Sequence, residues 1–111
     1  MEREAKKLLL DIFTASQAIQ EFNAGKSLHD YERSRLLRSA TEREFVIMGE
    51  AFDRLDKLAS DSALKAASKE EIISVRNRIL HNHDPVDDVI VWNVIQNNLP
   101  GLCKEVEKLI G

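Results

Sequence analysis

The side chains with the most chemical potential lie in one short stretch, residues 76–84, which reads RNRILHNHD. An arginine offers a planar fork of donors that suits a phosphate, and histidine is the side chain that acts as a general base near neutral pH. Together they can cleave RNA without a metal, because the base activates the 2′-hydroxyl and the cation stabilises the added negative charge at phosphorus. Arg76 and His81 are therefore the candidate catalytic residues.

Helical geometry limits how this pair can work. Five steps of about 100° put Arg76 and His81 about 140° apart around a helix and about 7.5 Å apart along it. Asn77 shares a face with His81. Both motif side chains reach one phosphate if the arginine bends round the helix, or if a second copy of the chain brings its own pair alongside. The structural alternative for Arg76 is an ion pair with a carboxylate such as Glu50, since a buried arginine needs a partner.

A metal site is a weaker alternative for the same stretch. His81, His83, Asp84 and Cys103 include zinc-ligand types, but residues two apart on a helix point about 200° apart. The two histidines could share one metal only beyond the end of the helix, so the sequence predicts no resident metal and no other cofactor. Cys103 is the only cysteine, which excludes an internal disulfide. It falls on an apolar stripe and is expected to pack as a small hydrophobic residue.

Four helical segments must position these residues. With 111 residues the chain has the size of one domain. Apolar residues recur at three- and four-residue steps over 3–22, 28–58 and 69–82, and from Asp87 or Asp88 through Pro100 to Leu109. The last stripe begins at Val89 and Trp92, and its continuity indicates a kinked or restarted helix. The fold class is an all-α antiparallel bundle of four main helices that also has room for a short fifth helix.

Two positions in the first half of the chain suggest how these helices pack. Gly49 lies in the middle of segment 28–58, where glycine weakens a helix, so we expect another helix to approach closely there. Several apolar stripes of the same segment exceed what one small bundle covers, which predicts a homodimer. Trp92 and the stripe from Met48 to Phe52 are expected in the core or at the dimer contact.

Charge and hydropathy narrow the possible partners. The 16 basic and 19 acidic residues give a net charge of −3, which excludes a uniformly basic nucleic-acid coat. Arg33, Arg35, Arg38 and Arg43 still concentrate positive charge, either as a solvated face with pairs such as Arg38–Glu42 or as a phosphate-binding rim. There is no apolar run of about 20 residues and no signal peptide, so the expected location is the cytoplasm, with no membrane contact.

Several short motifs together resemble a known family. Arg76-Asn77 with His81, after Gly49-Glu50-Ala51 and before Val86-Asp87, Val91-Trp92 and Leu99-Pro100, resembles the HEPN domain. The resemblance is to the HepT-like ribonuclease toxins of prokaryotic minimal-nucleotidyltransferase/HEPN toxin–antitoxin pairs. It covers essentially the whole chain as one domain, 1–111, and is strongest over residues 42–58 and 75–110.

The resemblance implies a function and partners. Such proteins form dimers in which two motifs meet in a composite cleft that cuts RNA, with Arg76 and His81 as the catalytic residues and Asn77 as the polar residue beside them. The expected activity is that of a metal-independent endoribonuclease toxin of a type VII-like system, with tRNA or mRNA as substrate. The expected partner is a cognate small nucleotidyltransferase antitoxin that transfers AMP to a tyrosine two residues after the motif histidine.

This chain departs from the family pattern at the modification position, which is His83. We expect His83 to line the cleft and contact RNA, without stable AMP modification, so that the antitoxin acts either by covering the cleft or by modifying another position. The tryptophan that the family usually has before the motif is replaced by Ile72-Ile73-Ser74. The competing hypothesis is a non-catalytic helical protein that binds a nucleotide or a nucleotidyltransferase, with Arg76 and His81 in structural roles.

Overall fold

The computed structural model describes residues 3–58, 68–81 and 86–111. Its elements are α1 (Arg3–Asn23), α2 (Leu28–Arg33), α3 (Arg35–Leu58), α4 (Lys69–His81), α5 (Asp88–Asn97) and α6 (Leu99–Ile110). No strand occurs in these ranges, so the prediction of an all-α bundle is confirmed. The described part of the chain forms six helices rather than four main ones, because two of the predicted segments are each interrupted once.

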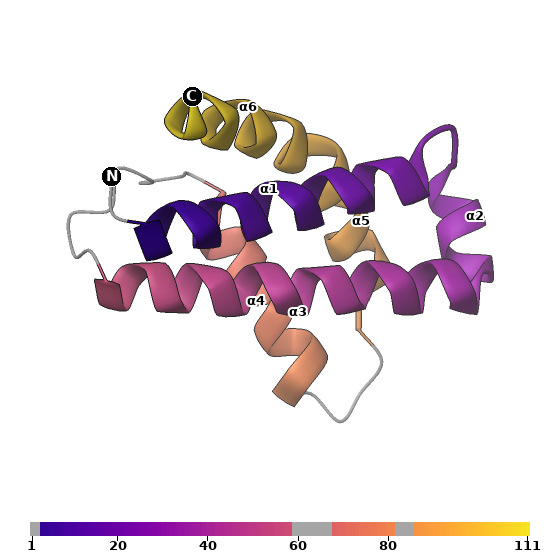
Figure 1. Cartoon of the computed structure of the whole chain (residues 1–111). Helices are drawn as coiled ribbons and strands as arrows, with labels where there is room; N and C mark the ends of the chain where they lie inside the picture. Colours follow the sequence, from indigo (N-terminus) through magenta and orange to yellow (C-terminus); the bar gives the residue numbers. More distant parts are fainter. Residues whose placement is uncertain (1–2, 59–67, 82–85) are drawn as a thin grey trace.

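The long helices α1 and α3 form the frame of the bundle. Figure 1 shows them side by side and running in opposite directions, joined by the short α2. Ile12 and Ile19 of α1, with Phe45, Met48 and Phe52 of α3, are at most 1% exposed. Complete burial of side chains of this size stabilises a fold by about 1.5–3 kcal/mol each. The expected core stripe from Met48 to Phe52 is therefore confirmed.

The turn between α1 and α2 follows the local sequence. Gly25 has a φ of 74°, the left-handed conformation that lets the chain leave α1 without the steric cost of a side chain. Ser27 then caps α2, since its hydroxyl accepts a hydrogen bond from the Asp30 amide at 3.1 Å. The Asp30 carboxylate accepts one from the Ser27 amide at 2.9 Å, which completes a capping box.

The predicted helix 28–58 is wrong at Ser34, where the chain adopts an extended conformation with φ −107° and ψ 102°. The Ser34 amide donates to the carbonyl of Tyr31 at the end of α2, and its hydroxyl accepts from the Leu37 amide at 3.0 Å. One serine thus ends α2 and caps α3. The break lets α2 turn across the end of the bundle and bury Tyr31 completely.

The second half of the chain covers the α1–α3 frame. Helix α4 packs on α3, α6 packs along α1, and α5 contacts α2, α4 and α6. The predicted restart near Pro100 is confirmed, since Asn98 ends α5 and precedes α6, with the proline in the first turn. Residue 82, the predicted last residue of α4, lies outside the described residues.

The predicted apolar stripe of the last helix is wrong at its first residue, Val89, but Trp92 packs against the core as expected. Val89 is 45% exposed and Trp92 is half-buried, whereas Val91 and Val94 are buried. Because α5 packs against three helices rather than one, it buries Val91 and Val94 in addition to Ile95, which belongs to the predicted stripe. From Leu99 onward the predicted stripe is correct. Among the described helices, none has the length and apolarity to cross a membrane.

Candidate functional site

Helix α4 carries the predicted motif and presents its two catalytic candidates to different surroundings. Arg76 is buried, with 8% of its surface exposed, and points toward α3. His81 is exposed in the last turn. This separation agrees with the angle of about 140° expected for five helical steps. Within one chain, α4 therefore brings both residues to one helix but not to one point.

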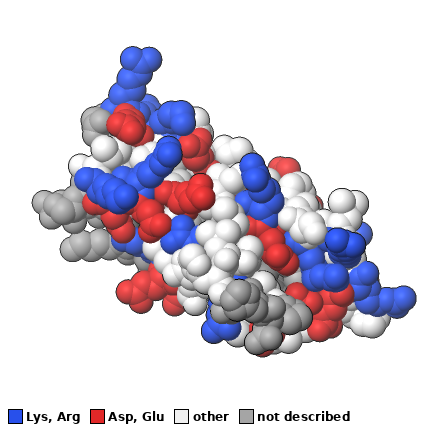
Figure 2. Space-filling view, turned by 90° about the horizontal axis from the view of Figure 1, so that it is seen from below, with Lys and Arg blue, Asp and Glu red and all other residues white. Residues whose placement is uncertain are grey.

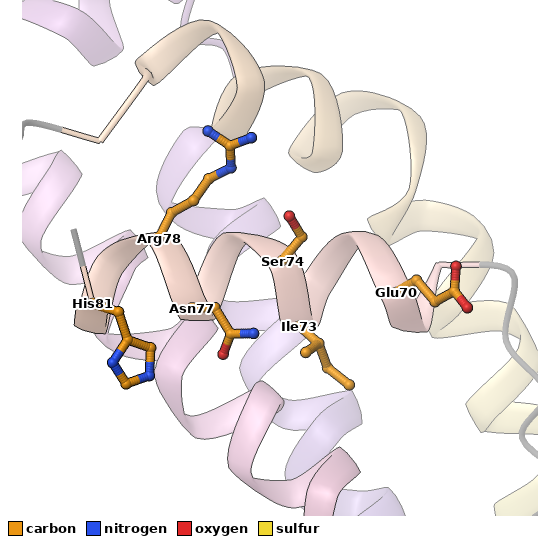
Figure 3. A pocket seen from close by; sticks show the side chains of 6 residues that line it. All are labelled: Glu70, Ile73, Ser74, Asn77, Arg78 and His81. Carbon is orange, nitrogen blue, oxygen red and sulfur yellow. The ribbon is translucent and has the colours of Figure 1, made fainter.

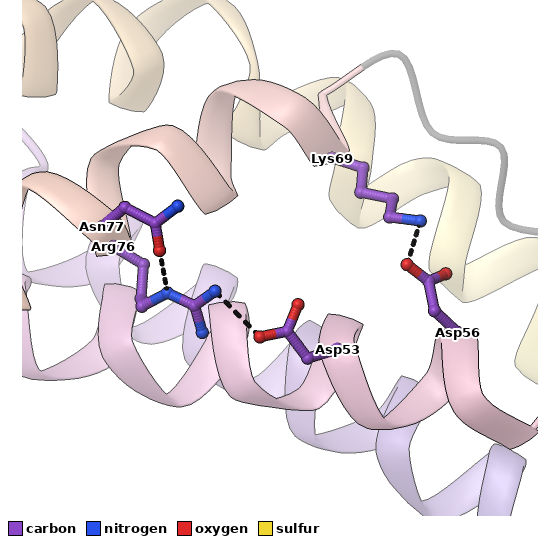
Figure 4. Close-up of polar contacts among 5 residues, drawn as sticks. All are labelled: Asp53, Asp56, Lys69, Arg76 and Asn77. Carbon is purple, nitrogen blue, oxygen red and sulfur yellow. Dashed lines mark hydrogen bonds and ion pairs between the residues drawn. The ribbon is translucent and has the colours of Figure 1, made fainter.

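Two oxygen atoms accept hydrogen bonds from the Arg76 guanidinium (Figure 4). Its Nη2 donates to Asp53 Oδ2 at 2.8 Å, and its Nε donates to Asn77 Oδ1 at 2.8 Å. The predicted carboxylate partner is thus present, but it is Asp53 rather than Glu50, which is exposed. The Asp53 side chain is half-buried, whereas the Arg76 side chain is almost completely buried. Water therefore reaches the ion pair mainly at the carboxylate.

The close approach predicted at Gly49 is confirmed and involves Arg76 itself. A Cβ atom added to Gly49 would lie 2.8 Å from Arg76 Cβ and 2.6 Å from Arg76 Cγ. Both distances are well below ordinary van der Waals contact, so only glycine leaves space for the arginine stem. The helical cost of glycine in α3 is therefore offset by the packing of α4.

His81 opens onto a groove of about 650 Å³ on the surface of α4 (Figure 3). The groove is lined by Glu70, Ile73, Ser74, Asn77, Arg78 and His81. Figure 3 shows Ile73, Asn77 and His81 on one side of the helix and Ser74 and Arg78 on another. The predicted shared face of Asn77 and His81 is thus confirmed, and Asn77 joins the two halves of the motif because it also contacts Arg76.

The sequence reasoning missed Arg78 as a groove residue. Arg78 is half-buried and makes no ion pair within the described residues. Its spacing of three residues from His81 is the signal that could have identified it, since such residues are neighbours on a helix. His83, the predicted supporting and modification position, lies outside the described residues, as does Asp84.

The sequence predicted that Cys103 packs as a small hydrophobic residue, and this prediction is wrong. It is half-buried, its Sγ donates to Ser16 Oγ at 3.3 Å, and it accepts from Gln20 Nε2 at 3.1 Å. The polar residues come from α1, which packs beside α6. In the described part of the chain, no three histidine, cysteine or acidic side chains gather in a way that could hold a metal ion.

The four predicted arginines are spread over the end of the bundle that carries α2. Arg33, Arg35 and Arg43 are exposed, whereas Arg38 is half-buried. The predicted Arg38–Glu42 ion pair is wrong, because Arg38 Nη1 instead donates to the backbone carbonyls of Tyr31 and Glu32. On the face seen in Figure 2, basic and acidic side chains are interspersed around an uncharged area, so no field of one sign covers it.

Comparison with known proteins gives consistent matches. Residues 12–109 match the family described as Ribonuclease HepT-like. A protein named "Putative RNase" from Methanocaldococcus jannaschii is 24% identical over 106 residues, 96% of each chain. A second with that name, from Caldanaerobacter subterraneus subsp. tengcongensis, is 30% identical over 86 residues, 78% of this chain and 76% of its own.

A third relative carries a more specific name. A protein named "Probable ribonuclease HepT" from Thermococcus cleftensis is 26% identical over 113 aligned positions, which cover 98% of each chain. No solved structure gives a significant match.

Proposed function

Because the chain belongs to the HepT-like ribonuclease family, we propose that it is an endoribonuclease that cuts RNA without a metal, with Arg76 and His81 as its catalytic residues. The observation that carries this proposal is the environment of Arg76. Two side chains hold the buried Arg76. The exposed groove beside it contains His81, the residue of the Arg-x4-His motif that can accept a proton. An ordered cation and a nearby imidazole are the two groups that transfer of a phosphoryl group between RNA oxygens needs, which supports the proposal.

In the proposed reaction, the neutral His81 imidazole removes the proton from a ribose 2′-hydroxyl. The resulting oxygen attacks the adjacent phosphorus, and the bond to the 5′-oxygen of the next nucleotide breaks. Arg76 stabilises the additional negative charge that the attack places on the phosphoryl oxygens, and the leaving 5′-oxygen takes up a proton from water while the His81 imidazolium returns its proton to solvent. The products are a 2′,3′-cyclic phosphate and a free 5′-hydroxyl.

The proposed site is composite and lies between two copies of the chain. Arg76 is buried toward α3 and His81 opens onto the groove, so one chain does not bring the two together, and in the proposed dimer the α4 helices of both protomers supply their motifs to one cleft. Leu36, Leu80 and Val89 are 82%, 51% and 45% exposed, apolar surface that a homodimer would cover in part. Asn77 and His83 would contact the RNA, and light scattering should show a stable dimer at micromolar concentration.

The proposed biological context is a prokaryotic, type VII-like toxin–antitoxin pair in the cytoplasm, with this single-domain chain as the toxin and tRNA or mRNA as its substrate. The cognate antitoxin would be a small nucleotidyltransferase. The only tyrosine, Tyr31, is completely buried, so it is not available to accept AMP in the folded protein. With His83 in the family's tyrosine position, the antitoxin would act by covering the cleft.

The Arg76–Asp53 ion pair also favours the second candidate function, a non-catalytic protein that binds a nucleotide or a nucleotidyltransferase. In this second function Arg76, paired with the carboxylate, joins α3 to α4 and has no catalytic role. The two functions differ in what they require of His81, because the structural role of Arg76 does not involve an exposed imidazole.

Incubation of the purified protein with total RNA, in EDTA and in magnesium, tests the proposed function. We expect cleavage in EDTA, loss of cleavage in His81→Ala, and full activity in His29→Ala. His29 is the matched control, since it is an exposed histidine on α2, away from the groove. Activity that disappears in EDTA and returns with magnesium would contradict the metal-free reaction, and an inactive wild type would favour the second candidate.

The proposed mode of inhibition has a separate test. The protein is incubated with its cognate nucleotidyltransferase and ATP, and its intact mass and activity are measured. We expect blocked cleavage with unchanged mass. A stable gain of AMP at His83 would overturn inhibition by occlusion and leave the ribonuclease proposal intact.

A further inference from the structure

Helix α3 presents two residues, one turn apart, to the arginine of the motif. Gly49 leaves the space in which the Arg76 stem lies, and Asp53, four residues later, accepts a hydrogen bond from Nη2 at 2.8 Å. Residues at this spacing lie on one face of a helix, so the stem and the head of the same side chain are held by consecutive turns. Asn77, the next residue of α4, accepts a hydrogen bond from Nε and so holds the side chain at a third position.

We propose that Asp53 is a positioning residue for Arg76, and that Gly49 provides the space that this position requires. The inference rests on the proposed ribonuclease function and extends it to two residues of α3 outside the Arg-x4-His motif. A guanidinium has five N–H donors, of which Asn77 and Asp53 each occupy one. Nη1, which lies beside Gly49, and the second donor of Nη2 make no hydrogen bond within the described residues, and the proposal assigns these donors to the phosphate, in an orientation set by α3 rather than by the RNA.

The negative charge of Asp53 should weaken RNA binding, although its hydrogen bond should favour catalysis. A carboxylate beside the arginine reduces the positive potential that attracts RNA, while its hydrogen bond holds the guanidinium in place. A positioning residue of this kind should therefore separate the two kinetic constants. Asp53→Ala should lower kcat about 10- to 100-fold, as expected for a misplaced catalytic group, and should leave KM unchanged or lower.

The conservative variant distinguishes positioning from charge. In Asp53→Asn, the side-chain oxygen still accepts a hydrogen bond from Arg76 but carries no charge. We expect its kcat to stay within about threefold of the wild type, since the geometry of the guanidinium is kept, and its KM to fall. An equal loss of kcat in the alanine and asparagine variants would overturn the role assigned to the hydrogen bond.

The chain offers a matched control on the same two helices. Asp56 of α3 forms an ion pair with Lys69 of α4, one turn from the Asp53–Arg76 pair (Figure 4). Asp56→Ala also removes an ion pair between α3 and α4, but it touches neither Arg76 nor the groove. We expect its kcat and KM to match those of the wild type, so an equal effect of both alanine variants would show a merely structural role and overturn the proposal.

A second variant tests the space at Gly49. In Gly49→Ala the new Cβ would displace the Arg76 stem, so kcat should fall on the same scale as in Asp53→Ala. Circular dichroism and a thermal melt check that each variant is folded at the assay temperature. A folded Gly49→Ala protein with wild-type kcat would contradict the proposed use of this glycine.

A readout without RNA separates failure of this inference from failure of the ribonuclease proposal. The Nη2–H of Arg76 that donates to Asp53 should give an NMR signal that exchanges slowly with water in the wild type and in Asp56→Ala, and rapidly in Asp53→Ala. If the wild type does not cut RNA, the ribonuclease proposal fails, and this signal alone decides whether Asp53 orders Arg76. An unchanged signal in Asp53→Ala overturns the inference whether or not RNA is cut.

Discussion

Two regions of the molecule bury a polar side chain and treat it differently. At the α3–α4 contact, Arg76 is 8% exposed and both Nε and Nη2 have oxygen partners. At the junction of α2, α3 and α5, Tyr31 is completely buried, and its hydroxyl has no hydrogen-bond partner within the described residues. The ring stacks in a tilted arrangement on Trp92, with centroids 5.8 Å apart.

The charges around the two polar groups differ as well. Burial raises the pKa of Tyr31, and the nearby Glu42 and Asp88 raise it further. Burial also raises the pKa values of Glu42 and Asp88, while Arg38 opposes this effect on both carboxyls. The buried charge of Arg76 is thus fixed by partners, whereas Tyr31 contributes its ring to the core. The difference teaches that this fold supplies partners for a buried charge but tolerates a buried neutral hydroxyl without one.

The largest expected effect concerns the motif. Arg76→Ala and His81→Ala should each lower the rate of RNA cleavage by about 10²–10⁴, because one removes the cation and the other the base. Only Arg76→Ala should also lower the free energy of unfolding, by about 1–3 kcal/mol, because it leaves Asp53 without its partner and opens space beside α3. His81→Ala should stay within about 0.5 kcal/mol of the wild type.

Urea unfolding and single-turnover cleavage on the same samples test this pair of variants. If Arg76→Ala and His81→Ala lowered the free energy of unfolding equally, the claim that only Arg76 stabilises the fold would be wrong. If either variant folded and cut RNA at the wild-type rate, its catalytic role would be wrong.

The Tyr31 region should depend on the ring and not on the hydroxyl. Tyr31→Ala should cost about 3–5 kcal/mol, as for other large buried aromatic side chains. Tyr31→Phe should change the free energy of unfolding by about 1 kcal/mol or less, toward higher stability, because it removes a buried hydroxyl without a partner. Urea unfolding of both variants at pH 7 measures this, and a loss above about 2 kcal/mol in Tyr31→Phe would show that the hydroxyl is satisfied.

The smallest expected effect is on the pH dependence of stability. Because the pKa of Glu42 is raised in the folded protein, the folded state binds a proton more tightly than the unfolded state. Stability should therefore fall as pH rises from about 4, the unfolded pKa, through the folded pKa. Asp88 contributes with the same sign.

Glu42→Gln isolates this contribution, since glutamine keeps the shape of the side chain and does not titrate. Urea unfolding between pH 4 and 7 should show a weaker fall in stability with rising pH in the variant than in the wild type. Two parallel curves would contradict the unfavourable burial of Glu42, and a steeper fall in the variant would reverse its sign.

Local patterns in the sequence predicted what depends on one helix or one turn. The buried stripe from Met48 to Phe52 of α3, the close approach at Gly49 and the restart of the helix near Pro100 all follow from residue types at fixed spacing. The break at Ser34 was missed because Arg33, Ser34 and Arg35 are compatible with a continuous helix. There the capping hydrogen bond to Leu37 outweighs the continuity of the helix.

For contacts between helices, the sequence predicted the type of partner but not the residue that supplies it. A carboxylate partner for Arg76 was expected, but whether it is Glu50 or Asp53 depends on how far α3 and α4 are offset along their axes. Those two positions differ by about 4.5 Å along a helix, and no pattern within one helix sets that offset. The polar surroundings of Cys103 depend in the same way on the packing of α6 against α1.

The ends of the RNA fragments made in EDTA test the central claim most directly, because they record which oxygen attacked the phosphorus. A ribonuclease that uses Arg76 and His81 in the proposed way leaves a 2′,3′-cyclic phosphate on the upstream fragment and a 5′-hydroxyl on the downstream fragment. Mass spectrometry of a single defined RNA distinguishes these ends from all others. The account predicts these two ends for the wild type and no new fragments for His81→Ala, whereas a 3′-hydroxyl with a 5′-phosphate would contradict it.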